Sequence, residues 1–166
     1  MRYHLFGITV KVEGELMADN HGNGGVSAQT DELGSTLMGE ALDRLAAGDD
    51  FSVVATAADS QGQRMTCEFD DDSAEQCLEA ARTWVRNGAR DENNACVIGK
   101  PACYAIAYLG AVADDDDVFR DALILEFGER GAECGYSAFS LVEGIGAGDN
   151  LAWSDPAPAG ETPSLL

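Results

Sequence analysis

Basic residues are scarce in this sequence. Ten lysines and arginines stand against thirty aspartates and glutamates, and only Lys11 and Lys100 are lysines. The resulting net charge of −20 repels phosphate backbones and anionic lipid. We therefore expect no direct binding to nucleic acid and no binding to a membrane surface. A macromolecular partner, if there is one, is expected to be a basic protein or a second copy of the chain.

The residues of catalytic and metal chemistry are also few. There are two histidines, His4 and His21, and the five cysteines are scattered without a Cys-x-x-Cys pair. This pattern argues against a disulfide framework and against a zinc knuckle. The sequence also lacks a serine elbow, a Walker sequence, a dinucleotide fingerprint and a calcium loop. We expect neither a metal nor a cofactor, and the sequence favours a protein that is not an enzyme.

No long apolar run is present, and the N-terminal residues lack the apolar region of a signal peptide. The sequence therefore predicts a cytoplasmic protein. Its 166 residues are enough for one self-sufficient core. We expect a single domain over residues 1–144. The segment 145–166 is rich in Gly, Pro and Ala, and we expect an extended or disordered tail, held on the surface by Leu151 and Trp153.

The first half of the chain alternates between strand and helix patterns. Residues 3–12 alternate with period 2, which predicts one half-buried strand. From about Thr30 an apolar stripe at helical spacing predicts a helix that ends at Gly48. Residues 51–57 and 64–69 flank a turn at 59–62 and predict a hairpin. A capping box at 73–76 then predicts a second helix that ends before Gly88.

Three apolar runs follow within residues 101–142, with only turn residues between them. They predict a three-stranded antiparallel meander, and the alternation of the first run suits a strand that is covered on both sides. The whole order is β-α-β-β-α-β-β-β, which indicates an α+β fold. Its first six elements have the order of a ferredoxin-like unit, so we expect both helices on one face of an antiparallel sheet with two extra strands at its edge. Exposed edge strands make a homodimer a reasonable expectation.

Two runs of aspartate are the candidate protein-binding residues. They are Asp70, Asp71 and Asp72 before the second helix, and Asp114, Asp115, Asp116 and Asp117 at a turn of the meander. Three explanations of the acidity remain open. The charge can simply keep the protein solvated, it can form a working face for a basic partner, or it can bind cations.

Two other groups are candidate sites. His21 lies in a glycine-rich loop with Gly22, Gly24 and Gly25, just before the first helix, where backbone amides could hold a ligand. The second group is a basic stripe on the second helix, formed by Arg82, Arg86 and Arg90. These arginines can balance the helix dipole and pair with Glu79 or Asp91, or they can contact the acidic face of another copy.

The sequence leaves three functions open. The first is a non-enzymatic acidic binding protein, such as an inhibitor, an immunity-type protein or a nucleic-acid mimic, that acts on a basic partner. The second is a small hydrolase or transferase that uses His21 in its loop. The third is a structural subunit that associates with itself. We expect the first.

Overall fold

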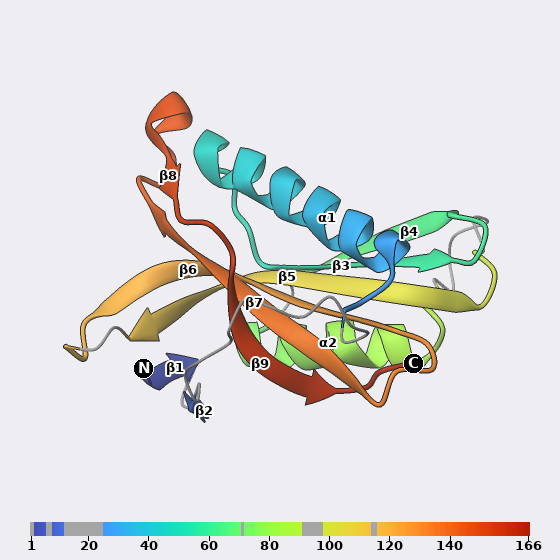
Figure 1. Cartoon of the computed structure of the whole chain (residues 1–166). Coiled ribbons are helices and arrows are strands. Elements are labelled where there is room, and N and C mark those ends of the chain that lie inside the picture. The colour runs from blue at the N-terminus through green and yellow to red at the C-terminus, as the bar shows by residue number, and fades with distance from the viewer. Residues whose placement is uncertain (1, 6–7, 12–24, 71, 91–97, 114–115) are drawn as a thin grey trace.

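A seven-stranded, curled antiparallel sheet with two helices forms the body of the described chain (Figure 1). This computed structural model describes residues 2–5, 8–11, 25–70, 72–90, 98–113 and 116–166. The helices are α1 (Ala28–Ala47) and α2 (Ala74–Arg86), with a short 3-10 helix η1 (Gly148–Asn150). The strands of the sheet are β3 (Val53–Asp59), β4 (Arg64–Phe69), β5 (Pro101–Ala113), β6 (Phe119–Glu129), β7 (Cys134–Glu143), β8 (Ala152–Trp153) and β9 (Ala157–Pro163). Their order is β4-β3-β5-β6-β7-β8, and β9 also pairs with β7. The predicted α+β class is confirmed.

The N-terminal strand differs from its prediction. The structure has two short strands, β1 (Arg2–Leu5) and β2 (Ile8–Lys11), which pair with each other as an antiparallel hairpin instead of forming one strand. They form a separate two-stranded sheet. Leu5 pairs with Ile8 and Arg2 with Lys11. The alternation over residues 3–12 is the same for one strand as for two paired strands, so it could not reveal the hairpin.

The two helices lie on opposite faces of the sheet (Figure 1). Successive strand residues point to opposite faces, and on β3 Val53 and Ala55 pack with α2 whereas Val54 and Ala58 pack with α1. The expected arrangement, with both helices on one face, is therefore not what the structure has. Its cause lies in the central strands, which are apolar on both faces and need a cover on each.

The predicted helix ends are confirmed by the caps. The Ser27 side chain accepts a hydrogen bond from the Thr30 backbone at the start of α1, and the last turn ends at Gly48 in the left-handed region. At the start of α2 the Ser73 side chain accepts from the backbone of Gln76, which is the first half of a capping box, and the Ser73 hydroxyl donates to the Gln76 side-chain oxygen. No helix among the described residues is both long and apolar enough to cross a membrane.

The hairpin and the meander are also confirmed. β3 and β4 pair around a turn that Asp59 organises, since its carboxylate accepts from the backbone amides of Gln61, Gln63 and Gly99. The hydrogen bond from Gly99 is the main cause that lowers the pKa of Asp59. β5, β6 and β7 form an antiparallel meander in the expected order. The turn at Asp59 thus fixes the start of β5 beside the end of β3.

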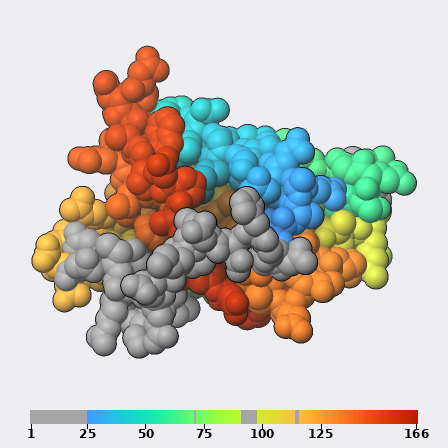
Figure 2. All heavy atoms as spheres, viewed as in Figure 1, coloured from blue at the N-terminus to red at the C-terminus, as the bar shows by residue number. Residues whose placement is uncertain are grey.

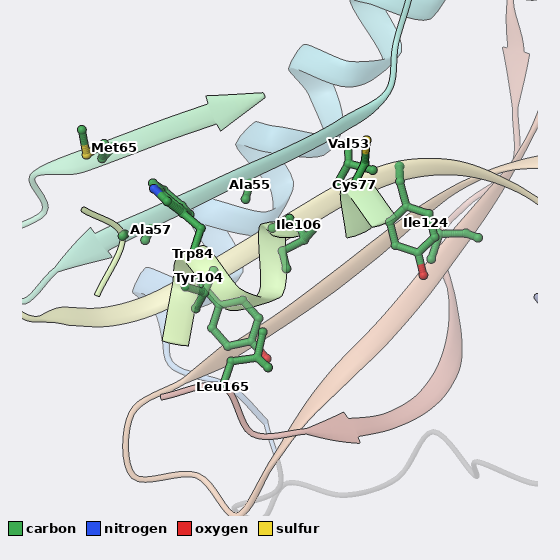
Figure 3. Close-up of a cluster of buried hydrophobic side chains, with 14 of the residues drawn as sticks. Val53, Ala55, Ala57, Met65, Cys77, Trp84, Tyr104, Ile106, Ile124 and Leu165 are labelled. Atoms are coloured by element: carbon green, nitrogen blue, oxygen red, sulfur yellow. The ribbon is translucent and has the colours of Figure 1, made fainter. Parts of the chain in front are cut away.

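The core on the α2 side contains a buried ion pair. Apolar side chains from α2 and from the strands meet there (Figure 3). Glu126 on β6 points into this face and is 3% exposed. Arg82 donates to both its carboxylate oxygens, at 3.0 Å from Nε and 2.5 Å from Nη2, and the Tyr108 hydroxyl donates to it at 3.1 Å. The pKa of Tyr108 is raised, first by burial and then by the Glu126 charge. Arg82 thereby joins α2 to the middle of the sheet.

Two glycines make room for Tyr104 in the same core. Tyr104 on β5 is paired with Gly128 on β6, and a Cβ atom on Gly128 would lie 2.9 Å from the tyrosine ring. A Cβ atom on Gly135 would lie 2.5 Å from the Tyr104 hydroxyl. The ring therefore occupies the space that side chains at these positions would fill. Burial raises the pKa of Tyr104 to about 12.

The segment 145–166 continues the sheet. Its η1 turn lies beside the end of α1, where the Gly146 amide donates to the Leu45 carbonyl. β8 then pairs with the end of β7, and β9 pairs with its first half. Leu151 is buried as expected of an anchor, whereas Trp153 is 57% exposed. The segment is extended and forms β-structure at the edge of the sheet.

Replacing Arg82 by Met should destabilise the fold strongly, because the Glu126 charge would stay buried without its partner. We expect a loss of about 3 to 5 kcal/mol in the free energy of unfolding. The matched control is Arg86→Met on the same helix, since Arg86 pairs with Glu79 at the surface and should cost less than about 1 kcal/mol. Urea unfolding of both variants measures the difference. Equal losses for the two variants would contradict the role of the buried pair.

Candidate binding surface

An apolar groove lies on the α1 face of the sheet, beside the helix. α1 packs on β3, β5 and the middle of β6, and it reaches β7 at Ser140, whose hydroxyl lies 3.9 Å from the Met38 sulfur. The outer wall comes from the C-terminal chain, which turns at Pro156 and runs along β7 as β9. In Figure 2 a strip of sheet lies recessed between α1 in blue and the C-terminal chain in red. The groove is therefore a direct result of one helix covering only part of a wide sheet.

Two adjoining cavities make up this groove, and they share Asp31, Phe127, Ala138 and Pro156. The larger holds about 510 Å³ and the smaller about 170 Å³. The larger is within the range of about 300 to 1,000 Å³ that small-ligand sites have. Its size suits one or two side chains of a partner.

Aromatic side chains form the floor of the groove. The rings of Phe127 and Tyr136, from β6 and β7, lie with centroids 6.1 Å apart and are tilted by 34°. Gly34 on α1 lies close to the sheet, since a Cβ atom there would be 3.3 Å from Leu125. This close approach lets the helix wall reach down to the floor. The groove is consequently apolar in its depth.

Both walls of the groove are acidic. Asp31 stands in the first turn of α1 on one side, and Glu161 on β9 stands on the other, directly across from Tyr136. The pKa of Tyr136 is raised, first by its contact with Cys134 and also by the Glu161 charge. No lysine or arginine lines this groove among the described residues, and neither carboxylate has an ion-pair partner there. A ligand in the groove meets an apolar floor and two negative charges.

Glu129 at the end of β6 fixes the N-terminal end of α1, and with it one wall of the groove. Its carboxylate accepts from the Ser27 backbone at 2.8 Å and from the Thr30 hydroxyl at 2.6 Å. A carboxylate at this position also interacts favourably with the helix dipole. These hydrogen bonds, with the Thr30 bond first, lower the pKa of Glu129. Asp31 directly follows Thr30 in the helix, so its position depends on this anchor.

The two aspartate runs lie toward the same end of the sheet. The first run begins after Phe69 at the end of β4. Val53 of β3 pairs with Phe69 on one side and with Tyr108 of β5 on the other, so the three residues form one row across the sheet. From Tyr108, β5 continues five residues to Ala113. Ala113 therefore lies roughly 17 Å beyond that row, at about 3.3 Å per residue, and Asp116 and Asp117 follow it in the chain. Asp70, Asp72, Asp116 and Asp117 are exposed, and Asp71, Asp114 and Asp115 lie outside the described residues. The four aspartates that the structure describes, Asp70, Asp72, Asp116 and Asp117, thus belong to two separate places on the surface.

Only Arg82 and Arg86 of the predicted arginine stripe lie on α2, because the helix ends at Arg86 and the backbone turns at Gly88 and Ala89 before Arg90. Arg82 points to the buried Glu126, and Arg86 pairs with Glu79 at 2.8 Å. Arg90 is exposed, while Asp91, the other expected partner, is outside the described residues. Pairing with Glu79 is what the simpler interpretation predicted. The proposed contact with a second copy would rest mainly on Arg90.

The glycine-rich loop can be followed only at its end. His21, Gly22 and Gly24 lie outside the described residues, whereas Gly25 is exposed and borders the groove.

Burial raises the pKa of the Cys103 thiol, which keeps this thiol protonated and unreactive. The described part of the chain contains no group of His, Cys, Asp or Glu placed to hold a metal ion.

A second cleft of about 540 Å³ lies where β6 and β7 separate. β7 leaves β6 after Leu141 and pairs with β8 instead, so that Trp153 lines the opening. Its charge is mixed, since Arg120 lines it together with Asp121 and Glu143. Trp153 and the nearby Phe119, which is 62% exposed, make this end of the sheet apolar. The mixed charge makes the cleft a less selective site than the groove.

Sequence reasoning missed the groove and the buried pair. The signal for Glu126 was a single carboxylate between Leu125 and Phe127, inside an apolar strand. The groove had no local signal, because its residues come from α1, β6, β7 and β9. Such residues meet only in the folded chain.

Replacing Glu129 by Gln should destabilise the protein at neutral pH and much less in acid. The pKa of Glu129 is lowered in the folded state from its ordinary 4.5. Its contribution is therefore present above that value and is lost as the pH falls through the folded-state pKa. We expect a cost of about 1 kcal/mol at pH 7. The control is Glu133→Gln in the following turn. Urea unfolding between pH 7 and pH 3 measures both, and a pH-independent cost would contradict this assignment.

Comparison of the chain with protein-family models, with curated proteins and with solved structures finds no match. The function must therefore be argued from the charges and surfaces of the chain itself. The described residues offer an acidic exterior and an apolar groove with acidic walls.

Proposed function

We propose that this protein is a non-enzymatic binding protein that engages a basic protein partner through its carboxylates. An inhibitor, an immunity-type protein and a nucleic-acid mimic are the kinds of protein that act in this way. The proposal includes no direct contact with nucleic acid or membrane, because both carry the same sign of charge. A cytoplasmic location fits this role.

One observation carries the proposal: among the described residues four of the scarce basic side chains, those of Arg44, Arg64, Arg82 and Arg86, form ion pairs within the protein. Arg44 pairs with Glu68 at 2.8 Å and Arg64 pairs with Glu40 at 2.8 Å. Arg82 is held by Glu126, as described above. The remaining carboxylates greatly outnumber the remaining cations. The exterior therefore presents a negative field that attracts basic proteins and speeds their association.

The exposed aspartate runs are the second support. Asp116 and Asp117 stand at the tip of the β5–β6 hairpin, and Asp70 and Asp72 stand ahead of α2. Exposed apolar side chains lie near the hairpin tip, namely Val118 at 52% and Phe119 at 62% exposure. Apolar contacts framed by charge are typical of protein interfaces. A basic partner would find both at this end of the molecule.

Neutralising the two aspartate runs should weaken binding to a basic probe more than neutralising other carboxylates. The probe is a fluorescent peptide of lysine and arginine, about 20 residues long, and fluorescence anisotropy measures its affinity at about 50 mM and about 500 mM NaCl. The test variant changes all seven aspartates of the two runs to Asn. We expect it to bind at least about tenfold more weakly at low salt. Screening by salt is weak under that condition, so each aspartate attracts peptide cations that lie within about 10 Å.

The control variant loses the same number of charges at exposed positions elsewhere. It changes Glu to Gln or Asp to Asn at Glu32, Asp43, Asp49, Asp50, Glu133, Asp149 and Asp155. We expect it to retain affinity within about threefold. An equal loss in both variants would mean that the runs have no special role. Absence of salt-dependent binding in the unmodified protein would overturn the proposed function as a whole.

A further inference from the structure

From its floor and walls, we infer that the groove beside α1 binds an extended basic segment of the partner, with a lysine or arginine side chain inserted. The inference rests on the proposed function, since it assigns a further contact of the same basic partner, apart from the aspartate runs, to the groove. The cation would lie between Asp31 and Glu161, and its aliphatic stem would lie on Phe127 and Tyr136. None of the aspartates from the two runs lines this groove.

The chemistry of the floor suits a long basic side chain. Lysine and arginine combine an apolar stem with a charged end, so they can cover aromatic rings while the charge stays near water or a carboxylate. A cation over an aromatic face is also attracted by the ring itself, by about 0.5 to 1 kcal/mol at exposed sites. Phe127 and Tyr136 provide two adjacent rings for such contact.

The walls select the sign of the ligand. Asp31 lies in the first turn of α1, and the hydrogen bond between Ser27 and Glu129 anchors that end of the helix. Glu161 lies on β9 and is paired with Tyr136 of β7. The two carboxylates therefore stand on rigid elements on either side of the same rings. An acidic or phosphorylated segment would meet two like charges and no cation among the described lining residues.

The shape favours an extended segment over a helix. The two cavities adjoin along α1, from Gly25 and Asp31 toward Met38. The smaller cavity, which Gly34 and Met38 line together with Leu125, holds about 170 Å³, which is room for a side chain but not for a helix of about 10 Å diameter. An extended chain that places alternate side chains into the groove satisfies this geometry.

Amide chemical-shift mapping of the full chain tests the inference. The probe is a ten-residue peptide, about 33 Å when extended, that alternates lysine and threonine. We expect the largest shifts at Gly34, Ser35, Ala138 and Gly160, which surround the groove. The variant Asp31→Asn with Glu161→Gln should bind at least about fivefold more weakly. Glu32→Gln with Glu133→Gln is the matched control and should bind as the unmodified protein does.

Each other outcome overturns the inference in a distinguishable way. Shifts confined to the residues around Asp70, Asp72, Asp116 and Asp117 would remove the groove from the interface while the proposed function stands. Equal affinity for a peptide alternating serine and valine would show that the acidic walls do not select a cation. Shifts at the groove that change with protein concentration in the absence of peptide would assign it to a second copy of the chain. Failure to bind the basic peptide at low salt would overturn both the inference and the proposed function.

Discussion

The double-sided burial of β5 is the constraint on which the rest of the structure depends. Tyr104 and Ile106 point into the core beneath α2, and Cys103 and Ala105 point into the core beneath α1. A strand that is apolar on both faces cannot leave either face to water, so each helix must cover one side. With one helix on each face of a wide sheet, the outer strands are only partly covered. The groove beside α1 follows from that shortage of cover.

Local features of the fold could be predicted from the sequence. Short-range hydrogen bonds and backbone preferences determine the helix caps and the tight turn, so the local sequence is enough to predict them. These features are the caps at Ser73 and Gly48 and the turn at 59–62. The three runs of the meander are long and bounded by turn residues, which is why they were predicted correctly. Even the double-sided character of β5 was visible in its alternation.

The arrangement of distant parts could not be predicted. An apolar stripe shows that a helix packs on the sheet, but it does not show on which face. The face depends on how α1 and the β4–α2–β5 connection are placed around the sheet. The sequence does not indicate that Glu126 is buried, because its partner Arg82 lies on a distant helix. The groove needs residues from four elements, and the β9 wall comes from a segment whose composition suggested a tail. The sequence shows that the protein is acidic. Only the fold shows that Asp31 and Glu161 lie on the walls of the aromatic groove.

The most direct measurement is the set of nuclear Overhauser contacts between a bound basic peptide and the protein. The account predicts contacts between the side-chain methylenes of a peptide lysine and the ring protons of Phe127 and Tyr136, which form the floor of the groove. Contacts to Phe119 and Trp153 alone, at the other end of the sheet, would contradict the placement of the basic side chain in the groove.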